Sequence, residues 1–218
     1  MNTHRMCDDH PGQIWINCSP CRADALVSGS TDAIIAWNAR RQHVELDTRI
    51  PTRYVTATAT DPGVRAWLER WHAAANDCPS LIMVGPVGTG KTWQAYGAIR
   101  DAVTGPNTTD WLAISAVDLY ASMRPRDGLD TETVMQRYRD VGLLMIDDLG
   151  VGKHSEWVEE VVYRVIDARY EAMKPIIFTS NIEPGRFGAV FGERVASRLA
   201  EIGMVVAIQG VDRRKAAV

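Results

Sequence analysis

The sequence lacks several features that would place it in a broad class at once. No apolar run approaches the ~20 residues that a membrane-spanning helix needs, and the N-terminal stretch MNTHRMCDDHPG has no apolar signal core. We therefore expect a cytoplasmic protein with no membrane partner. Neither sign of charge is in large excess, because 24 Lys and Arg residues accompany 27 Asp and Glu residues, for a net charge of −3. A nucleic-acid partner would need a local basic patch.

Cysteine is scarce, and three of the four cysteines lie within the first 22 residues, a segment with little apolar periodicity. Cysteines in a cytosolic chain are more often metal ligands, catalytic groups or buried apolar residues than disulfides. Cys7-x-x-His10 followed by Cys18-x-x-Cys21 offers three thiolates and one imidazole, which suits a closed, structural Zn²⁺ site. The alternatives are unrelated free cysteines, or His4 as a less well spaced ligand in place of His10.

The 218 residues are enough for one sizeable core and a small appendage. After the cysteine-bearing segment, residues 30–46 open with possible helix caps and continue without Gly or Pro, which predicts one helix. Residues 47–63 contain two prolines, one glycine and five threonines, and predict an extended linker. We therefore predict an N-terminal region (1–46), a linker (47–63) and a main domain (64–218). Cys78, at the entrance to a strand of that domain, is expected to be a small buried apolar residue.

Short apolar strands alternate with helices in the main domain. The first predicted helix carries Val64, Trp67, Leu68 and Trp71 on one face, where core packing is favoured over a stacking role for the tryptophans. The predicted strands are LIMV (81–84), DWLAISA (110–116), VGLLMIDD (141–148), IIFTS (176–180) and MVVAIQG (204–210). Strands that are apolar on both faces predict an α/β fold, a parallel sheet with helices on both sides.

The first of these strands leads into GPVGTGKT, which matches G-x-x-x-x-G-K-[ST] in the context of strand, loop and helix that confirms a phosphate-binding loop. Backbone N–H groups and the helix N-terminus hold phosphate oxygens in such a loop, Lys91 reaches the β- and γ-phosphates, and Thr92 binds Mg²⁺. The residues predicted to contact ATP here are Gly85, Pro86, Val87, Gly88, Thr89, Gly90, Lys91 and Thr92.

Two further strand ends carry polar groups. LLMIDD ends in Asp147, placed to assist Thr92 in holding Mg²⁺, and in Asp148, placed to polarise an attacking water. TSN ends the next apolar strand and offers Asn181 near the γ-phosphate. A buried strand that ends in turn-forming Asp or Asn residues is the alternative interpretation of both motifs.

The set GPVGTGKT, LLMIDDLG, TSN and GERVASRL, in that order, resembles the AAA+ ATPases of the DnaC, DnaI and IstB group over roughly residues 50–215. IPTRY and VIDARY are similar to connectors of that group. The DnaC-type helicase loaders resemble the chain most, because a small cysteine-bearing region precedes the ATPase core. The resemblance implies a P-loop NTPase fold of the AAA+ type, preceded here by the zinc-binding segment and a helix.

The same resemblance assigns roles to individual residues. It implies that Asp147 is the Mg²⁺-associated acid, that Asp148 is the catalytic acid where many AAA+ proteins have Glu, and that Asn181 is the first sensor. Arg198 matches the arginine finger that reaches the γ-phosphate of a neighbouring subunit, with Arg194 as the weaker candidate. Arg214 in VDRRK matches the second sensor, with a register uncertain by one residue. A finger that acts in trans implies assembly into a ring or spiral.

These features predict an ATP-dependent helicase loader that binds a hexameric DnaB-type replicative helicase and assists its loading onto single-stranded DNA. A set of basic and aromatic residues before the second motif could track the DNA backbone, with Tyr138 as a stacking surface, although a solvated charged face explains it as well. That set is Arg124, Arg126, Arg137, Tyr138 and Arg139. The alternatives are an IstB-type transposition helper ATPase and, less favoured, a small-molecule P-loop kinase.

Overall fold

The computed structural model describes residues 46–107, 109–128, 130–150 and 155–212. The chain forms two compact units, Met1–Thr56 and Ala57–Val218. In the described part of the first unit, residues 46–49 are helical and the 3-10 helix η2 (Thr52–Tyr54) follows. The predicted linker over 47–63 is therefore not one extended segment, and its last residues belong to the second unit.

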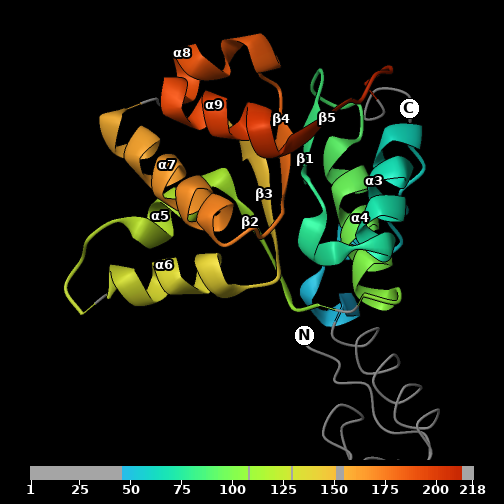
Figure 1. Cartoon of the computed structure of the whole chain (residues 1–218), viewed down its shortest axis with the longest axis horizontal. Coiled ribbons are helices and arrows are strands. Elements are labelled where there is room, and N and C mark those ends of the chain that lie inside the picture. Colours follow the sequence, from blue (N-terminus) through green and yellow to red (C-terminus); the bar gives the residue numbers. More distant parts are fainter. Residues whose placement is uncertain (1–45, 108, 129, 151–154, 213–218) are drawn as a thin grey trace, which may run out of the picture. The chain divides into compact units, whose positions relative to one another are not determined.

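The second unit is built on a parallel sheet with the strand order β2-β3-β4-β1-β5 (Figure 1). Its strands are β1 (Ser80–Val84), β2 (Trp111–Ser115), β3 (Leu143–Leu149), β4 (Ile176–Ser180) and β5 (Gly203–Ala207). Every residue of β1 and β4 is buried, as their unbroken apolar sequences predict. Because all described strands run the same way, the loops that follow β1, β3, β4 and β5 emerge at one edge.

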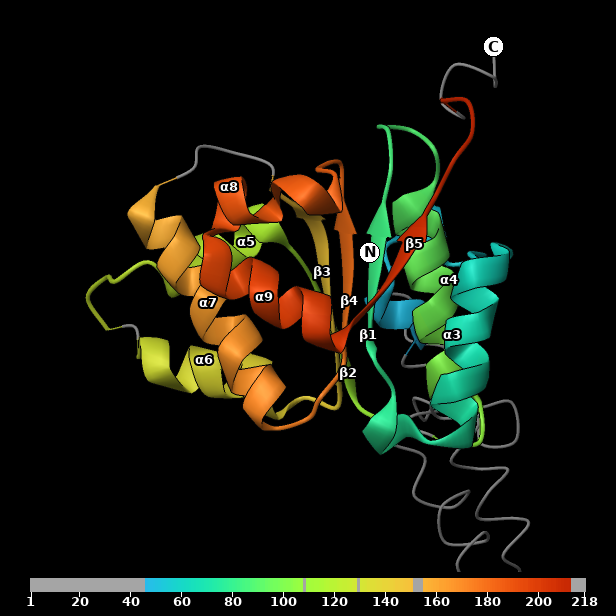
Figure 2. The ribbon, with the colours of Figure 1, turned by 45° about the horizontal axis from the view of Figure 1, so that its top comes forward.

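Helices cover both faces of the sheet, with α3 and α4 on one side and α5, α6, α7 and α9 on the other (Figures 1 and 2). The helices are α3 (Pro62–Ala73), α4 (Lys91–Thr104), α5 (Ala116–Met123), α6 (Thr131–Asp140), α7 (Glu156–Glu171), α8 (Phe187–Phe191) and α9 (Glu193–Ile202), with η3 (Ala75–Asp77) and η4 (Pro184–Arg186). The predicted α/β architecture is thus confirmed. In the described part of the chain, none of these helices is long and apolar enough to cross a membrane.

One helix boundary is set by a glycine. The segment 191–202 contains no proline and carries apolar residues at helical spacing, but the chain breaks at Gly192, whose φ of 85° lies in the left-handed region. The break separates α8 from α9, and α9 packs against α7 as a helix of its own.

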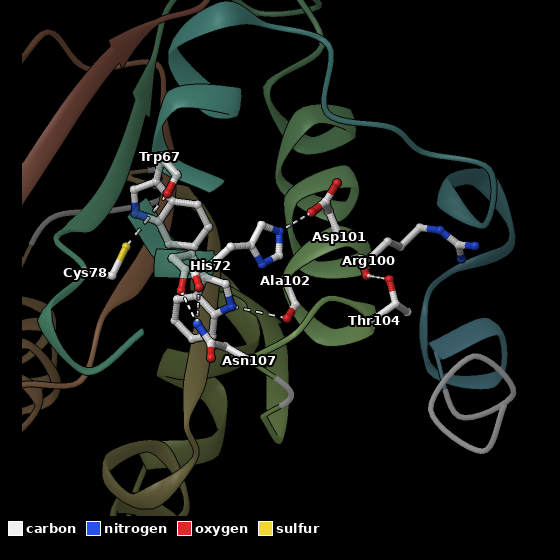
Figure 3. Close-up of polar contacts among 9 residues, drawn as sticks. Trp67, His72, Cys78, Arg100, Asp101, Ala102, Thr104 and Asn107 are labelled. Carbon is white, nitrogen blue, oxygen red and sulfur yellow. Dashed lines mark hydrogen bonds and ion pairs between the residues drawn. The ribbon is translucent and has the colours of Figure 1, made fainter. Parts of the chain in front are cut away.

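Helix α3 packs against α4, and both predicted core tryptophans of α3 are buried. Figure 3 shows Trp67 from α3 and Ala102 from α4. The rings of Trp67 and Trp71 stack with centroids 5.6 Å apart, and the Trp71 indole N–H donates to Ala102 O at 3.2 Å. Cys78 is buried beside Trp67, and burial raises the pKa of its thiol to about 12. The thiol therefore stays protonated at neutral pH, which confirms the prediction of a small buried apolar residue.

The segment before α3 lies against α4 as part of the same unit. The side-chain oxygen of Gln94 accepts from the backbone N–H groups of Thr60 and Asp61, at 2.8 and 3.1 Å. A β-carbon on Gly97 would lie 2.3 Å from the carbonyl carbon of Thr58, so only glycine allows this approach. The segment is therefore fixed to the helix that follows the phosphate loop.

Helix α6 contradicts one predicted role. Tyr138 is only 4% exposed, because it shares the apolar side of α6 with Met135, and its hydroxyl hydrogen-bonds to Ser122. It is therefore unavailable as a stacking surface for DNA, whereas Arg137, one position earlier, is exposed.

A buried arginine joins α7 to the end of α6. Arg169 is 0% exposed, and its guanidinium donates to five backbone carbonyls. The acceptors are Tyr138, Arg139, Val141, Gly142 and Pro175, at 2.7 to 3.3 Å. Burial lowers the pKa of Arg169 only to about 10, so the charge persists at neutral pH and favours the carbonyl end of α6.

Candidate nucleotide site

The phosphate loop, residues 85–90, connects β1 to α4 at the carboxyl edge of the sheet. Gly85, Gly88 and Gly90 have φ values of 149°, 84° and 100°, which L side chains rarely adopt. A β-carbon on Gly85 would lie 2.2 Å from Ile208 O in the segment after β5. The glycines of the motif are thus required both by backbone conformation and by close packing.

Lys91 is the first residue of α4, and its side chain folds back against the phosphate loop. Its side chain is largely buried, and Nζ donates to Gly85 O and Pro86 O, each at 2.8 Å, and to Asn181 Oδ1 at 2.6 Å. A buried ammonium group requires such acceptors, because burial without them is costly. Lys91 therefore connects the phosphate loop to the end of β4, and the predicted sensor Asn181 lies beside it.

Thr92 and Asp147 also meet, as the motifs predict. The Thr92 hydroxyl lies 3.0 and 3.2 Å from the two carboxylate oxygens of Asp147, and the Thr179 hydroxyl donates to Asp147 Oδ1 at 2.6 Å. Burial raises the pKa of Asp147, while the bond from Thr179 opposes that shift. Hard oxygen donors of this kind suit Mg²⁺, so the pair fits the ion that an ATP site requires.

Asp148 points away from the core because β3 bulges at this position. The register between β3 and β4 shifts between Ile146 and Leu149, and Asp148 takes a φ of 55°. Asp tolerates this left-handed conformation better than most residues. The bulge leaves Asp147 half-buried and Asp148 exposed, so neighbouring carboxylates face different surroundings.

Sequence reasoning missed Thr179. Its hydroxyl accepts from the Asp148 N–H at 2.8 Å and donates to Asp147, so one buried side chain fixes both acids. The only signal was a pair of hydroxyl residues at the end of the otherwise apolar strand IIFTS. The second of the pair, Ser180, donates to Leu149 O at 2.7 Å and closes the end of the bulge.

Arg198 lies apart from this cluster. It projects from α9 towards α7, where Nε donates to Asp167 and the guanidinium lies over the rings of Tyr163 and Tyr170. Arg194, one helical turn earlier, is exposed. Among the described contacts none joins Arg198 to the phosphate loop of its own chain, as a residue that acts on a neighbouring subunit would require.

Other predicted residues lie outside the described part of the chain. They are Arg214 and the proposed zinc ligands Cys7, His10, Cys18 and Cys21. Within the described ranges, no group of His, Cys, Asp and Glu residues forms a metal-binding cluster. A cavity of about 540 Å³ lies between the residues that precede β1 and β4, at the sheet edge opposite the phosphate loop, and none of the predicted site residues lines it.

Comparison with known proteins agrees with this geometry. The chain is 32% identical over 136 residues to the chromosomal replication initiator protein DnaA of Gloeobacter violaceus, an alignment that covers 61% of this chain and 30% of DnaA. It is 25% identical over 123 residues to the replicative helicase loader DnaC of Escherichia coli K12, covering 55% of this chain and 49% of DnaC. The chain therefore spans about half the length of DnaC and about a third of the length of DnaA.

Solved structures share the fold. The crystal structure of the DnaC helicase loader superposes with a TM-score of 0.64 at 22% identity, covering 73% of this chain and 100% of that one. DnaI gives the same TM-score at 18% identity, covering 73% of this chain and 95% of that one. DnaA from Aquifex aeolicus bound to AMPPCP gives 0.62 at 22% identity, over 78% and 54% of the two chains.

The predicted resemblance to the DnaC, DnaI and IstB group of AAA+ ATPases is therefore confirmed. The sequence profile described as IstB-like ATP binding protein matches residues 69–215, which is more than half of the chain. That match shows that the chain belongs to the IstB-like family of ATP-binding AAA+ proteins.

Proposed function

We propose that this protein is an ATP-hydrolysing helicase loader. The observation that carries the proposal is the convergence of Lys91, Thr92, Asp147, Asp148 and Asn181 at one edge of the sheet, in a chain related to DnaC. Three separate sequence motifs supply these residues, and a nucleoside triphosphate with its Mg²⁺ is the ligand that would contact all of them.

ATP would be held by the N–H groups of the phosphate loop and by Lys91. Nucleotide phosphates would replace the acceptors that Lys91 now contacts, Gly85 O and Pro86 O. Thr92 and Asp147 would hold Mg²⁺, which neutralises charge on the β- and γ-phosphates when bound. Asp147 must be ionised for this role, and a raised pKa makes ion binding sensitive to acid.

Hydrolysis would use Asp148 and Asn181. The exposed carboxylate of Asp148 makes no hydrogen bond within the described part of the chain and can accept a proton from an attacking water. Asn181, held by Lys91, can donate its amide N–H groups towards the γ-phosphate. Arg198 would complete the site of a neighbouring subunit, so activity would require assembly into a ring or spiral.

The proposed partner is a hexameric DnaB-type replicative helicase, by relation to proteins named as replicative helicase loaders. Cys7, His10, Cys18 and Cys21 supply a donor set suited to one structural Zn²⁺, and a segment this poor in apolar residues would fold through metal binding. We assign this zinc-bearing segment to helicase docking. Single-stranded DNA would contact exposed arginines such as Arg126 and Arg137.

Copurification of the full chain with a DnaB-type hexamer, with and without ATP, tests the loader function. A complex whose stability changes with ATP, and no longer does so with Lys91→Ala, is the expected result. Failure to bind helicase under both conditions would contradict it.

A second candidate is a transposition helper ATPase, which the match to the IstB-like profile favours. The same bait should then retain a transposase and not the helicase. Parallel pull-downs with both partners separate the two functions, because the ATP site would be identical in each.

A further inference from the structure

Three residues on one stripe of α7 surround Arg198. Tyr163, Asp167 and Tyr170 are spaced i, i+4 and i+7, so they line a single face of the helix. The guanidinium carbon of Arg198 lies 5.5 Å from the Tyr163 ring centroid and 5.0 Å from that of Tyr170, and Asp167 accepts from Nε. The guanidinium is thus held at one edge by an ion pair and flanked by two aromatic rings.

The stripe itself is held in place. The Tyr170 hydroxyl donates to Glu201 on α9 at 2.8 Å, so α7 and α9 are joined by two polar contacts about one turn apart. The side chains of Arg198 and Asp167 are 29% and 23% exposed, which makes this a partly shielded pair and not a solvated surface contact.

The two terminal guanidinium nitrogens of Arg198 remain available to a ligand. Asp167 contacts Nε, and within the described chain the two terminal nitrogens have no hydrogen-bond acceptor. Those terminal groups are the ones that bind phosphate oxygens in pairs. A carboxylate that only braced α9 against α7 could equally have paired with the terminal nitrogens and blocked them.

We infer that Asp167 is a positioning residue that presets Arg198, between Tyr163 and Tyr170, to donate from its terminal nitrogens to the γ-phosphate of a neighbouring subunit. This inference rests on the proposed function, in which Arg198 acts in trans. Fixing the guanidinium before subunits meet lowers the cost of ordering a long side chain in the transition state. Arg194, exposed on the same helix, has no comparable support.

Subunit mixing tests the inference. Asp167→Ala should keep ATP affinity within about twofold and lower the assembly-dependent kcat by about 10- to 100-fold, the effect of a small misplacement of a catalytic group. Asp167→Glu, which can still reach Nε, should retain more activity than Asp167→Ala. Glu132→Gln, which removes the exposed ion pair between Glu132 of α6 and Arg164 of α7, is the matched control and should leave kcat unchanged.

Mixtures locate the defect within the assembly. Asp167→Ala protein mixed with Lys91→Ala protein should regain activity, because one supplies an intact ATP site and the other a correctly held finger. Asp167→Ala mixed with Arg198→Ala should regain none, because both lack that finger. A brace that only stabilised the fold would not produce this pattern.

The possible failures are distinguishable. If Arg198→Ala abolishes hydrolysis while Asp167→Ala keeps the wild-type kcat, the positioning role is wrong and the proposed function stands. A rise in kcat for Asp167→Ala would show that Asp167 restrains the finger, which also overturns the inference. If Arg198→Ala itself retains full activity, the trans site is wrong and the inference falls with it.

Discussion

Lys91 Nζ donates to Asn181 Oδ1 at 2.6 Å, which joins the phosphate loop to the end of β4 across 90 residues of sequence. Lys91 also donates to two carbonyls of its own loop, so it holds the loop closed as well as offering charge to phosphate. The lysine therefore serves both the fold of the loop and the binding of its ligand.

Lys91→Ala is expected to remove nucleotide binding. Loss of a buried charge that pairs with phosphate costs about 2 to 5 kcal/mol of binding free energy. Titration with a fluorescent ATP analogue measures the change, and Lys174→Ala, which alters a half-buried lysine near the opposite sheet edge, is the matched control. Unchanged affinity in Lys91→Ala would refute the assignment of the loop.

Asp148→Asn should keep ATP binding and lose turnover. Asn also tolerates the left-handed backbone at this position, where φ is 55°, so the bulge should persist. An amide cannot accept the proton of the attacking water, and such losses typically amount to about 10²- to 10⁴-fold. Phosphate release at saturating ATP measures the effect, and surviving turnover would place the base elsewhere.

Asp147→Asn is expected to stabilise the nucleotide-free protein at neutral pH. Burial raises the pKa of Asp147 above 3.8, so the unfolded chain releases its proton at lower pH than the folded chain does. Stability present below pH 3.8 is therefore lost as the pH rises through the folded pKa, and the amide avoids that loss. The variant should melt higher at pH 7, by about 2 to 4 °C per kcal/mol.

The control for that measurement is Asp127→Asn, in an exposed loop. The melting advantage of Asp147→Asn should shrink as the pH falls towards 4, because the wild-type carboxyl then becomes neutral as well. An advantage that is constant with pH would mean that the ionisation of Asp147 is not its cause.

Arg169→Ala should unfold the protein more readily than any surface change. It would remove the donor for five carbonyls, several of them buried, and each buried acceptor left unpaired costs about 1 to 3 kcal/mol. Arg164→Ala, on the same helix but in an exposed ion pair with Glu132, should cost less than about 1 kcal/mol. Urea denaturation compares the two, and equal losses would contradict the role of Arg169.

The sequence predicted those parts of the site that local motifs encode. Gly85 to Thr92 could be recognised because a glycine loop between an apolar strand and a helix has one common use, and Asp147 because it ends a buried strand. Thr179 and the bulge at Asp148 could not, because they depend on the register between β3 and β4. Register is a property of two paired strands, and neither strand carries it alone.

Roles of helix residues were harder to predict than their positions. Arg169 lies among the buried residues of α7, but its five carbonyl partners come from chain segments that only the fold brings together. Tyr138 was expected at a DNA surface because arginines flank it, yet its spacing from Met135 put it on the apolar face of α6. Charge near an aromatic residue was a weaker guide than helical periodicity.

The last prediction concerns Asp212, whose carboxylate lies against the phosphate loop. A β-carbon on Gly88 would be 1.9 Å from Asp212 Oδ1, so the segment after β5 sets an acid where phosphate charge would gather. The segment is held there by the bond from Ile208 N–H to Val84 O at 2.8 Å. A negative charge at this place should oppose the approach of a triphosphate.

Asp212→Asn is therefore expected to tighten ATP binding by about threefold to tenfold, which corresponds to about 1 kcal/mol. The gain should diminish at high salt, because screening weakens repulsion between partly exposed charges. Asp77→Asn makes the same change of charge in η3, before β1 and so at the opposite edge of the sheet, and should leave affinity unchanged. Weaker binding by Asp212→Asn would show instead that the carboxylate organises the loop for its ligand.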